Sequence, residues 1–269
     1  MAKNEIDEQD LLSPGYNDDD EEEEEEEEED NGSSMTLVEH LEELRWRIFK
    51  SIIAIFVGAC VAFIFRGQIL GFLELPLPGK LADPLTGGKP VVTGITEGFT
   101  VYLLISIAVG FVAALPVVLY QMWAFIAPGL LAKEKKYAVP FIFVGLFLFA
   151  AGVALGYIVL QYPVQWLVTF GSESFAELIS AGSYFTFVAF FMLAFGIVFE
   201  IPLLLTFLAQ VDLLSSRTLA KKRAVAHVSM WIASTFLTPG ADIYSPIFLG
   251  VSMSCLYELS IIFIKIIKK

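Results

Sequence analysis

Six stretches of the chain are apolar over lengths typical of membrane-spanning helices. They lie near residues 48–66, 99–122, 138–160, 184–209, 224–238 and 246–264. An α-helix rises about 1.5 Å per residue, so about 20 residues cross the roughly 30 Å of hydrocarbon in a bilayer. The fifth stretch is shorter than that and requires either local thinning of the bilayer or help from its flanks. The pattern predicts an all-α integral membrane protein with six transmembrane helices.

Composition supports the membrane class, because 56% of the 269 residues are hydrophobic and the mean hydropathy is +0.69. The net charge of −13 arises in residues 1–34, which contain 17 Asp and Glu residues and one Lys. Such a segment has little apolar surface to offset the entropy cost of ordering. It also lacks the basic start of a secretory signal and the Arg-rich character of a transit peptide. We therefore expect a disordered acidic tail over 1–34 and one membrane domain over 35–269.

The distribution of Lys and Arg predicts the side of the membrane on which the chain begins and ends. Six crossings leave both termini on one side, and the segments on that side contain 13 of the 16 basic residues that follow the tail. The other three, Arg66, Lys80 and Lys89, fall in segments on the opposite side. Cytoplasmic loops carry an excess of Lys and Arg, so we expect both termini in the cytoplasm. Residues 67–97, rich in Pro and Gly, are expected to form an ordered cap on the outer side.

The polar residues give no support for catalysis or for a metal site. Cys60 and Cys255 lie inside apolar spans, which is typical of small buried residues without redox work. The two histidines, His40 and His227, are too few for a bis-histidine haem. The chain has neither a Gly-rich phosphate loop nor a Ser/His/Asp set. We expect no enzyme activity, no cofactor or metal, and no binding of nucleic acid.

An amphipathic helix is predicted just before the first span, over "TLVEHLEELRWRIFK" (36–50). Its leucines recur at helical intervals, and its polar side carries His40, Glu43 and Arg47. One interpretation is a solvated face with an intrahelical pair between Glu43 and Arg47, which contributes only about 0.3–0.5 kcal/mol. The other interpretation is a recognition surface at the cytoplasmic interface.

A carboxylate inside the fourth span is the least expected residue of the chain. Glu200 lies in "FGIVFEIPLLL" (195–205), two residues before Pro202. A charge in hydrocarbon costs several kcal/mol unless it faces a bundle interior or a wet cavity, so such residues are functional candidates. Pro202 has no N–H and frees a carbonyl of the preceding turn. The side chain either forms a polar notch for a partner helix or is hydrogen-bonded to a neighbouring Ser, Thr or Tyr for packing alone.

A further motif, "YQMWAFIAPGLLAKEKK" (120–136), follows the second span. Trp123 and Phe125 suit an interfacial aromatic belt, and Glu134 stands among lysines. Together with "HLEELRWR" (40–47), "FGIVFEIP" (195–202) and "TPGAD" (238–242), this motif resembles the TatC family of twin-arginine protein translocases. The motifs occur in the family's order among the six spans. The resemblance covers about 36–269, which is essentially all but the acidic tail.

The resemblance implies a curved, glove-like bundle of six helices that acts as a receptor and not as a solute pore. In this family the first cytoplasmic segment and the first cytoplasmic loop recognise the Arg-Arg pair of signal peptides on folded cargo. The residues of this chain that match the family's signal-peptide-binding positions are Glu43, Arg45 and Arg47 in the first segment, and Phe125 and Glu134 in the loop.

The remaining matched positions lie in the later spans. Glu200 and Glu258 take the positions of the family's intramembrane acids and are expected to contact partner subunits, while Asp242 matches the acid of the last outer turn. Pro246 departs from the family, which commonly has glutamine there, so a polar contact at that position is not carried over.

The implied partners are twin-arginine signal peptides, single-span subunits of the TatA and TatB type, the lipid bilayer, and further copies of the chain within a larger complex. The implied location is the cytoplasmic (inner) membrane of a prokaryote. Two other functions fit part of this pattern. A proton-coupled solute transporter would also use an intramembrane Glu and a Pro-broken helix, but the chain has no evident internal repeat. A purely structural scaffold would not explain Glu43 and Glu134.

Overall fold

The computed structural model describes residues 37–77, 89–127, 138–170, 178–240 and 242–267. It divides into two units, Met1–Arg45 and Trp46–Lys269, which are considered separately. The helices are α2 (Leu37–Ile64), α3 (Arg66–Leu73), α4 (Glu97–Ile126), α6 (Ala138–Val159), α7 (Gln161–Phe170), α8 (Ala181–Val198), α9 (Ile201–Gln210), α10 (Ser216–Lys221), α11 (Arg223–Leu237) and α12 (Tyr244–Ile267). The described chain is helical apart from short connections and one isolated β-bridge, so the expected all-α class is confirmed.

Five of the expected spans coincide with helices long and apolar enough to cross a membrane. These segments are Val38–Ile64, Glu97–Ile126, Val139–Phe170, Ala181–Gln210 and Tyr244–Ile267. Helix α11, which covers the fifth expected span, has 15 residues and does not reach that length. The count of six crossings therefore stays a prediction. The expected acidic tail over 1–34 lies outside the described residues.

The fourth span is broken where the sequence places Pro202. Helix α8 ends at Val198 and α9 begins at Ile201, with Phe199 and Glu200 between them. Pro202 is the second residue of α9, where its missing N–H costs no helical hydrogen bond. The N–H of Leu204 resumes the ladder by donating to the carbonyl of Glu200 at 2.9 Å. This break is the hinge between α8 and α9.

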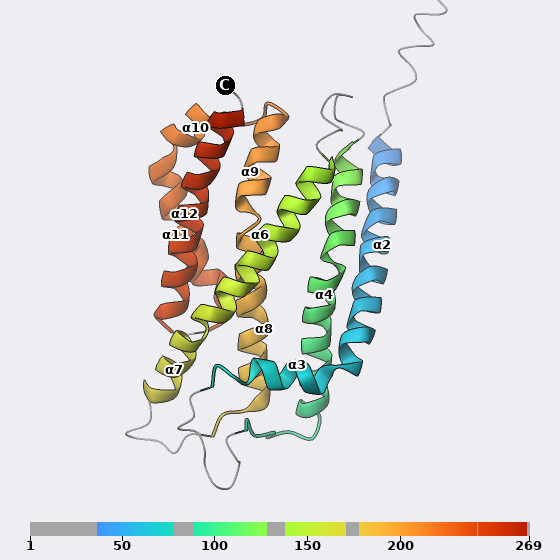
Figure 1. The fold of residues 1–269 in the computed structure, drawn as a ribbon, viewed down its shortest axis with the longest axis vertical. Helices are drawn as coiled ribbons and strands as arrows, with labels where there is room; N and C mark the ends of the chain where they lie inside the picture. The colour runs from blue at the N-terminus through green and yellow to red at the C-terminus, as the bar shows by residue number, and fades with distance from the viewer. Residues whose placement is uncertain (1–36, 78–88, 128–137, 171–177, 241, 268–269) are drawn as a thin grey trace, which may run out of the picture. The chain divides into compact units, whose positions relative to one another are not determined.

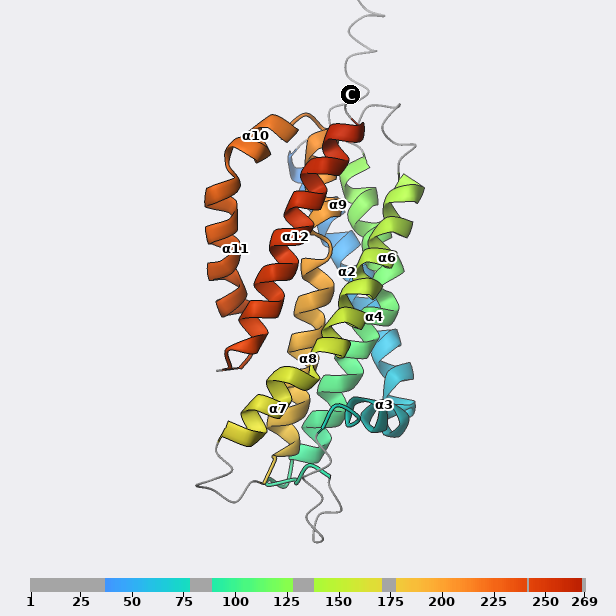
Figure 2. The ribbon, with the colours of Figure 1, turned by 60° about the vertical axis from the view of Figure 1, so that its left-hand side comes forward.

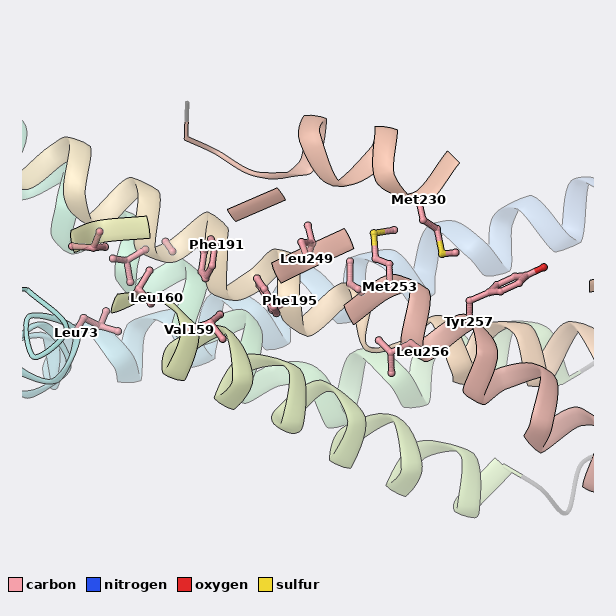
Figure 3. Close-up of a cluster of buried hydrophobic side chains, with 14 of the residues drawn as sticks. Leu73, Val159, Leu160, Phe191, Phe195, Met230, Leu249, Met253, Leu256 and Tyr257 are labelled. Atoms are coloured by element: carbon pink, nitrogen blue, oxygen red, sulfur yellow. The ribbon is translucent and has the colours of Figure 1, made fainter. Parts of the chain in front are cut away.

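Helix α8 forms the centre of the unit Trp46–Lys269 and packs against both α4 and α6, while α12 packs along α9 and α11 (Figures 1 and 2). The side chains of Phe185, Phe191 and Phe195 on α8 are at most 2% exposed. Part of this core, including residues of α8 and α12, is drawn in Figure 3. The backbones of α6 and α8 approach closely at Gly152, where an added Cβ would lie 2.6 Å from the carbonyl oxygen of Phe195. The absence of a side chain there permits this packing.

The short helix α3 runs across the ends of α4 and α8 (Figure 1). Two carbonyls at its end accept hydrogen bonds from tyrosine hydroxyls of neighbouring spans. The hydroxyl of Tyr184 on α8 donates to the carbonyl of Leu73 at 2.6 Å, and that of Tyr157 on α6 donates to Phe72 at 3.0 Å. The ring of Tyr157 also stacks on Phe72 at 4.5 Å between centroids. Helix α3 is thus fixed to two spans.

Residues 89–97, the last described part of the connection after α3, pair with the segment before α8, and the outer cap stays a prediction. Val91 pairs with the chain beside Ser180: its N–H donates to Ile179 and its carbonyl accepts from Ala181, both at 2.8 Å. Glu97 at the start of α4 strengthens this junction by accepting hydrogen bonds from the hydroxyl of Ser180 and the N–H of Gly182, each at 2.6 Å. Residues 78–88 lie outside the described part.

The described cations are distributed unevenly between the two ends of the unit Trp46–Lys269. At one end α4 and α9 finish and α6 and α11 begin; the other end carries α3 (Figures 1 and 2). We call the first the basic end, because its described cations are Arg47, Lys50, Arg217, Lys221, Lys222, Arg223 and Lys265, whereas Arg66 and Lys89 are near the α3 end. This asymmetry has the form expected for a membrane protein whose basic end faces the cytoplasm.

Candidate functional site

Two of the predicted signal-peptide residues, Arg47 and Phe125, lie at the basic end. The guanidinium of Arg47 on α2 donates to the side-chain oxygen of Gln121 on α4 at 3.5 Å, which is a long hydrogen bond. Phe125 follows Gln121 by one helical turn and is half-buried. Helices α2 and α4 therefore lie side by side where α4 ends.

The other three predicted signal-peptide residues are not placed against this pair. Glu43 and Arg45 belong to α2 within the first unit, where Glu43 is half-buried and Arg45 is exposed. Glu134 lies outside the described residues. The structure therefore brings together Arg47 and the α4 end that carries Phe125, and leaves the proximity of Glu43 and Glu134 as a prediction.

Trp123 corrects one expectation from the sequence. An interfacial ring would face lipid and water, but the Trp123 side chain is only 4% exposed. It packs against Phe141 of α6 at 4.8 Å and Phe207 of α9 at 5.8 Å between ring centroids, and these two rings are 5.8 Å apart. We call Trp123, Phe141 and Phe207 the aromatic cluster. Sequence reasoning missed it because the three residues come from separate spans, each of which is rich in aromatic residues.

Glu200 lies at the hinge with its carboxyl oxygens buried. A Cβ added to Gly145 of α6 would come within 3.3 Å of one of these oxygens, 3.0 Å of Leu119 on α4 and 2.9 Å of Leu203 on α9. Glycine at position 145 therefore leaves the space that the carboxyl group occupies. Among the described residues neither oxygen has a hydrogen-bond partner, so the alternative of a Ser, Thr or Tyr partner finds no support there. An unpartnered buried carboxyl group is costly and is characteristic of a functional position.

Glu258, the second expected intramembrane acid, has partners within the chain. Its carboxylate lies 2.9 Å from the guanidinium of Arg223 and 3.2 Å from Nε2 of His227, both on α11. The three side chains are 33–50% exposed, so the ion pair is only partly shielded from its surroundings. Sequence reasoning missed Arg223 and His227, although their spacing of four residues places them on one face of a helix.

Asp242 caps the last helix of the chain. Its carboxylate, 5% exposed, accepts hydrogen bonds at 2.6 Å from both the N–H and the hydroxyl of Ser245. This spacing of three residues is that of a helix N-cap, and it satisfies a donor that has no partner inside α12. Pro246 follows within the first turn, where a missing N–H is tolerated. The departure from glutamine is therefore compatible with the helix.

No group of three or more His, Cys, Asp or Glu side chains within the described residues has the arrangement of a metal site. The candidate site thus consists of a polar surface at the basic end, a buried carboxyl group at the hinge of the fourth span, and the aromatic cluster between them. This arrangement suits the binding of a partner.

Comparisons with known proteins identify the family. The family model described as Sec-independent protein translocase protein (TatC) matches residues 39–251. The chain belongs to the TatC family. Among curated members, that of Desulforapulum autotrophicum is 37% identical over 225 residues, covering 83% of this chain and 82% of the relative. The TatCd protein of Bacillus subtilis is 36% identical over 228 residues, covering 84% of this chain and 89% of the relative.

A solved TatC structure supports the same assignment. The crystal structure of a twin-arginine translocase receptor, TatC, is similar to this chain with a TM-score of 0.72 and 31% sequence identity, covering 86% of this chain and 100% of that one. Membership of the TatC family, with five spans long enough to cross a bilayer, makes the chain a multi-pass membrane protein of the bacterial inner membrane. TatC proteins are translocase subunits, and theirs is not an enzyme family.

Proposed function

We propose that the chain is the receptor subunit of a twin-arginine translocase, and that it recognises the Arg-Arg signal peptides of folded proteins and assembles the complex that exports them. The observation that carries this proposal is the similarity over 86% of the chain to a solved structure named as the twin-arginine translocase receptor. The alternative of a proton-coupled solute transporter is not favoured, since the curated relatives are named as protein translocase subunits.

The proposed topology has six crossings, with α11 as the short fifth one and both termini in the cytoplasm. The excess of described cations at the basic end supports this orientation through the positive-inside rule. The proposed domain division is an acidic tail over 1–34 followed by one membrane domain over 35–269, which makes the six crossings. In this orientation Arg47 and Phe125 face the cytoplasm, where signal peptides arrive.

Glu43 and Glu134 are the proposed partners of the two signal-peptide arginines. A guanidinium group is planar and forms two parallel hydrogen bonds to one carboxylate, so two neighbouring arginines require separate acids, best carried on different segments. Arg45, Arg47 and Phe125 are proposed to line the same surface. The hydrogen bond between Arg47 and Gln121 supports this arrangement, because it joins α2 to the helix that leads into the segment containing Glu134.

Glu200 and Glu258 are the proposed intramembrane contacts for single-span partner subunits, and further copies of the chain are expected in the complex. The buried carboxyl group of Glu200 has no described hydrogen-bond partner and gains most from a polar partner side chain. To make such a contact, the carboxylate of Glu258 must first lose its ion pair with Arg223. Asp242 is proposed to preserve the last outer turn through its cap on α12.

Site-specific photo-crosslinking in inverted membrane vesicles tests the receptor function. A photo-reactive residue at position 125 should crosslink to an exported precursor with an Arg-Arg signal, and a Lys-Lys version of the same precursor should reduce the yield by about tenfold. Phe147, which is 72% exposed on α6, provides a control position that should give no precursor adduct. Equal adducts with both precursors, or none at position 125, would contradict the proposed function.

A further inference from the structure

Helix α9 contacts α4 and α6 in two successive layers. In the first layer Glu200 and Leu203 lie against Leu119 of α4 and Gly145 of α6. In the second layer Phe207 lies against Trp123 and Phe141, the other members of the aromatic cluster. Trp123 is one helical turn from Leu119, and Phe141 is one turn from Gly145.

Glu200, which precedes α9, and the two α9 residues that make these contacts share one face of the helix. Positions 200, 203 and 207 are separated by three and four residues, which places them in a row. The distance from Glu200 to Phe207 along the axis is about 10 Å, at about 1.5 Å per residue. Helix α9 therefore meets the aromatic cluster towards its far end and the hinge at its near end, while α12 packs along it.

The hinge is the place in the fourth span where the helix is interrupted. Pro202 has no N–H to donate back into α8, and the α9 ladder starts with the bond from Leu204 to Glu200. A shift of Phe207 would therefore be accommodated by a change of the backbone at Glu200. Helix ends and residues that absorb backbone changes are the usual sites of such motion.

The aromatic cluster also reaches the proposed peptide surface. Trp123 lies in the last turn of α4, two residues before Phe125 and two after Gln121, the partner of Arg47. A peptide that contacts Phe125 and Arg47 alters the environment of that last turn. The buried Trp123 ring is in direct contact with Phe141 and Phe207, so a displacement of Trp123 would reach Phe207.

We propose that Phe207, through Trp123 and Phe141, couples signal-peptide occupancy at the end of α4 to the position of α9 and hence of Glu200. Phe207 is a positioning residue, since it would act through Trp123 and Phe141. The proposal rests on the proposed receptor function and adds its internal regulation.

The test uses the full chain in lipid nanodiscs, with an environment-sensitive fluorophore attached after Leu204→Cys in a background carrying Cys60→Ala and Cys255→Ala. Leu204 is 56% exposed on α9, so the label reports the surroundings of α9 without entering the aromatic cluster. A synthetic Arg-Arg signal peptide should change the emission of the label. Phe207→Leu should lower the amplitude of that change by roughly fivefold or more at saturating peptide, a size typical of coupling between sites.

Further variants separate coupling from folding. Phe207→Leu should leave the peptide dissociation constant within about threefold of the parent value, because the surface itself is unchanged. Phe207→Tyr retains the ring and should retain the fluorescence response. Phe141→Leu should lose the response. Phe147→Leu, at an exposed position of α6, the helix that also carries Phe141, should keep the response. The double variant Phe141→Leu with Phe207→Leu should be no worse than either single change.

The possible results of these measurements lead to different conclusions. If Phe207→Leu responds like Phe147→Leu while the parent protein binds and responds to the peptide, the coupling is wrong and the receptor function stands. If Phe207→Leu and Phe141→Leu lose peptide binding and thermal stability together, the cluster is only structural and the proposal is overturned. If the parent protein does not bind the Arg-Arg peptide, the receptor function fails and the coupling fails with it.

Discussion

The carboxyl group of Glu200 occupies space that exists because residue 145 is glycine. An oxygen of Glu200 lies 3.3 Å from the position that a Cβ on Gly145 would take, with Leu119 and Leu203 still closer. The sequence places the acid in the fourth span and the glycine in the third. Only the fold shows that the two belong to the same layer of packing.

Substitution of Gly145 is therefore expected to displace Glu200. Gly145→Ala meets only the flexible ends of side chains, so it should cost less than Gly145→Val, for which we expect about 1–3 kcal/mol from overpacking. Thermal unfolding in detergent measures this loss of stability, and the export activity of the two variants should decrease in the same order. Gly71→Ala is the matched control, since an added Cβ there meets nothing within 4 Å. Equal stability of Gly145→Val and the parent protein would show that the layer is not close-packed.

Glu97 is predicted to hold the outer connections together. Besides Ser180 and Gly182 of the α8 start, it accepts hydrogen bonds from the N–H and hydroxyl of Thr93 and from the N–H of Gly94. Glu97→Ala removes all of these acceptors, so residues 89–96 should become sensitive to a protease added on the outer side. Glu97→Gln keeps one acceptor oxygen and should be intermediate.

The control for Glu97 is Thr100→Val on the same helix, which removes only a bond to the carbonyl of Thr96. Limited proteolysis followed by mass spectrometry locates the cuts. If Glu97→Ala is cleaved no faster than Thr100→Val, the junction between the two outer connections does not depend on this carboxylate.

The cap formed by Asp242 should contribute to stability through α12. Asp242→Ala leaves the N–H of Ser245 without its acceptor in a buried position, and loss of an N-cap costs about 0.5–2 kcal/mol. Asp242→Asn keeps an acceptor oxygen and should lose less than half of that. Pro246→Gln should be tolerated, because position 246 lies in the first turn and either residue fits there. Thermal unfolding of the three variants ranks them, and a neutral Asp242→Ala would contradict the cap.

The sequence predicts those features that depend on local pattern. The five long spans follow from hydrophobic runs, and the break at the hinge follows from Pro202. Features that join distant segments were not predicted. Glu97 resembles an ordinary acid at a helix start, yet it bonds Ser180, 83 residues later. The sequence predicts that Glu258 contacts a partner subunit, yet its carboxylate already pairs with Arg223 and His227 of the same chain.

Trp123 illustrates the same limit for aromatic residues. A tryptophan at the end of a span is typical of an interfacial belt, and that pattern led to the wrong environment. The ring is buried because α6 and α9 bring Phe141 and Phe207 to it. Sequence position along one helix does not determine which face a neighbouring helix covers.

The central claim, that Glu43 and Glu134 hold the two arginines of a signal peptide, is tested most directly by a binding cycle. Affinities for Arg-Arg and Lys-Lys peptides are measured with the parent protein, Glu43→Ala, Glu134→Ala and the double variant, with Glu42→Ala as the matched control for a neighbouring exposed acid. The account predicts that each single change weakens Arg-Arg binding by about tenfold or more and Lys-Lys binding much less, because only guanidinium forms the paired hydrogen bonds. Unchanged Arg-Arg affinity in both single variants, or an equal loss for the two peptides, would contradict it.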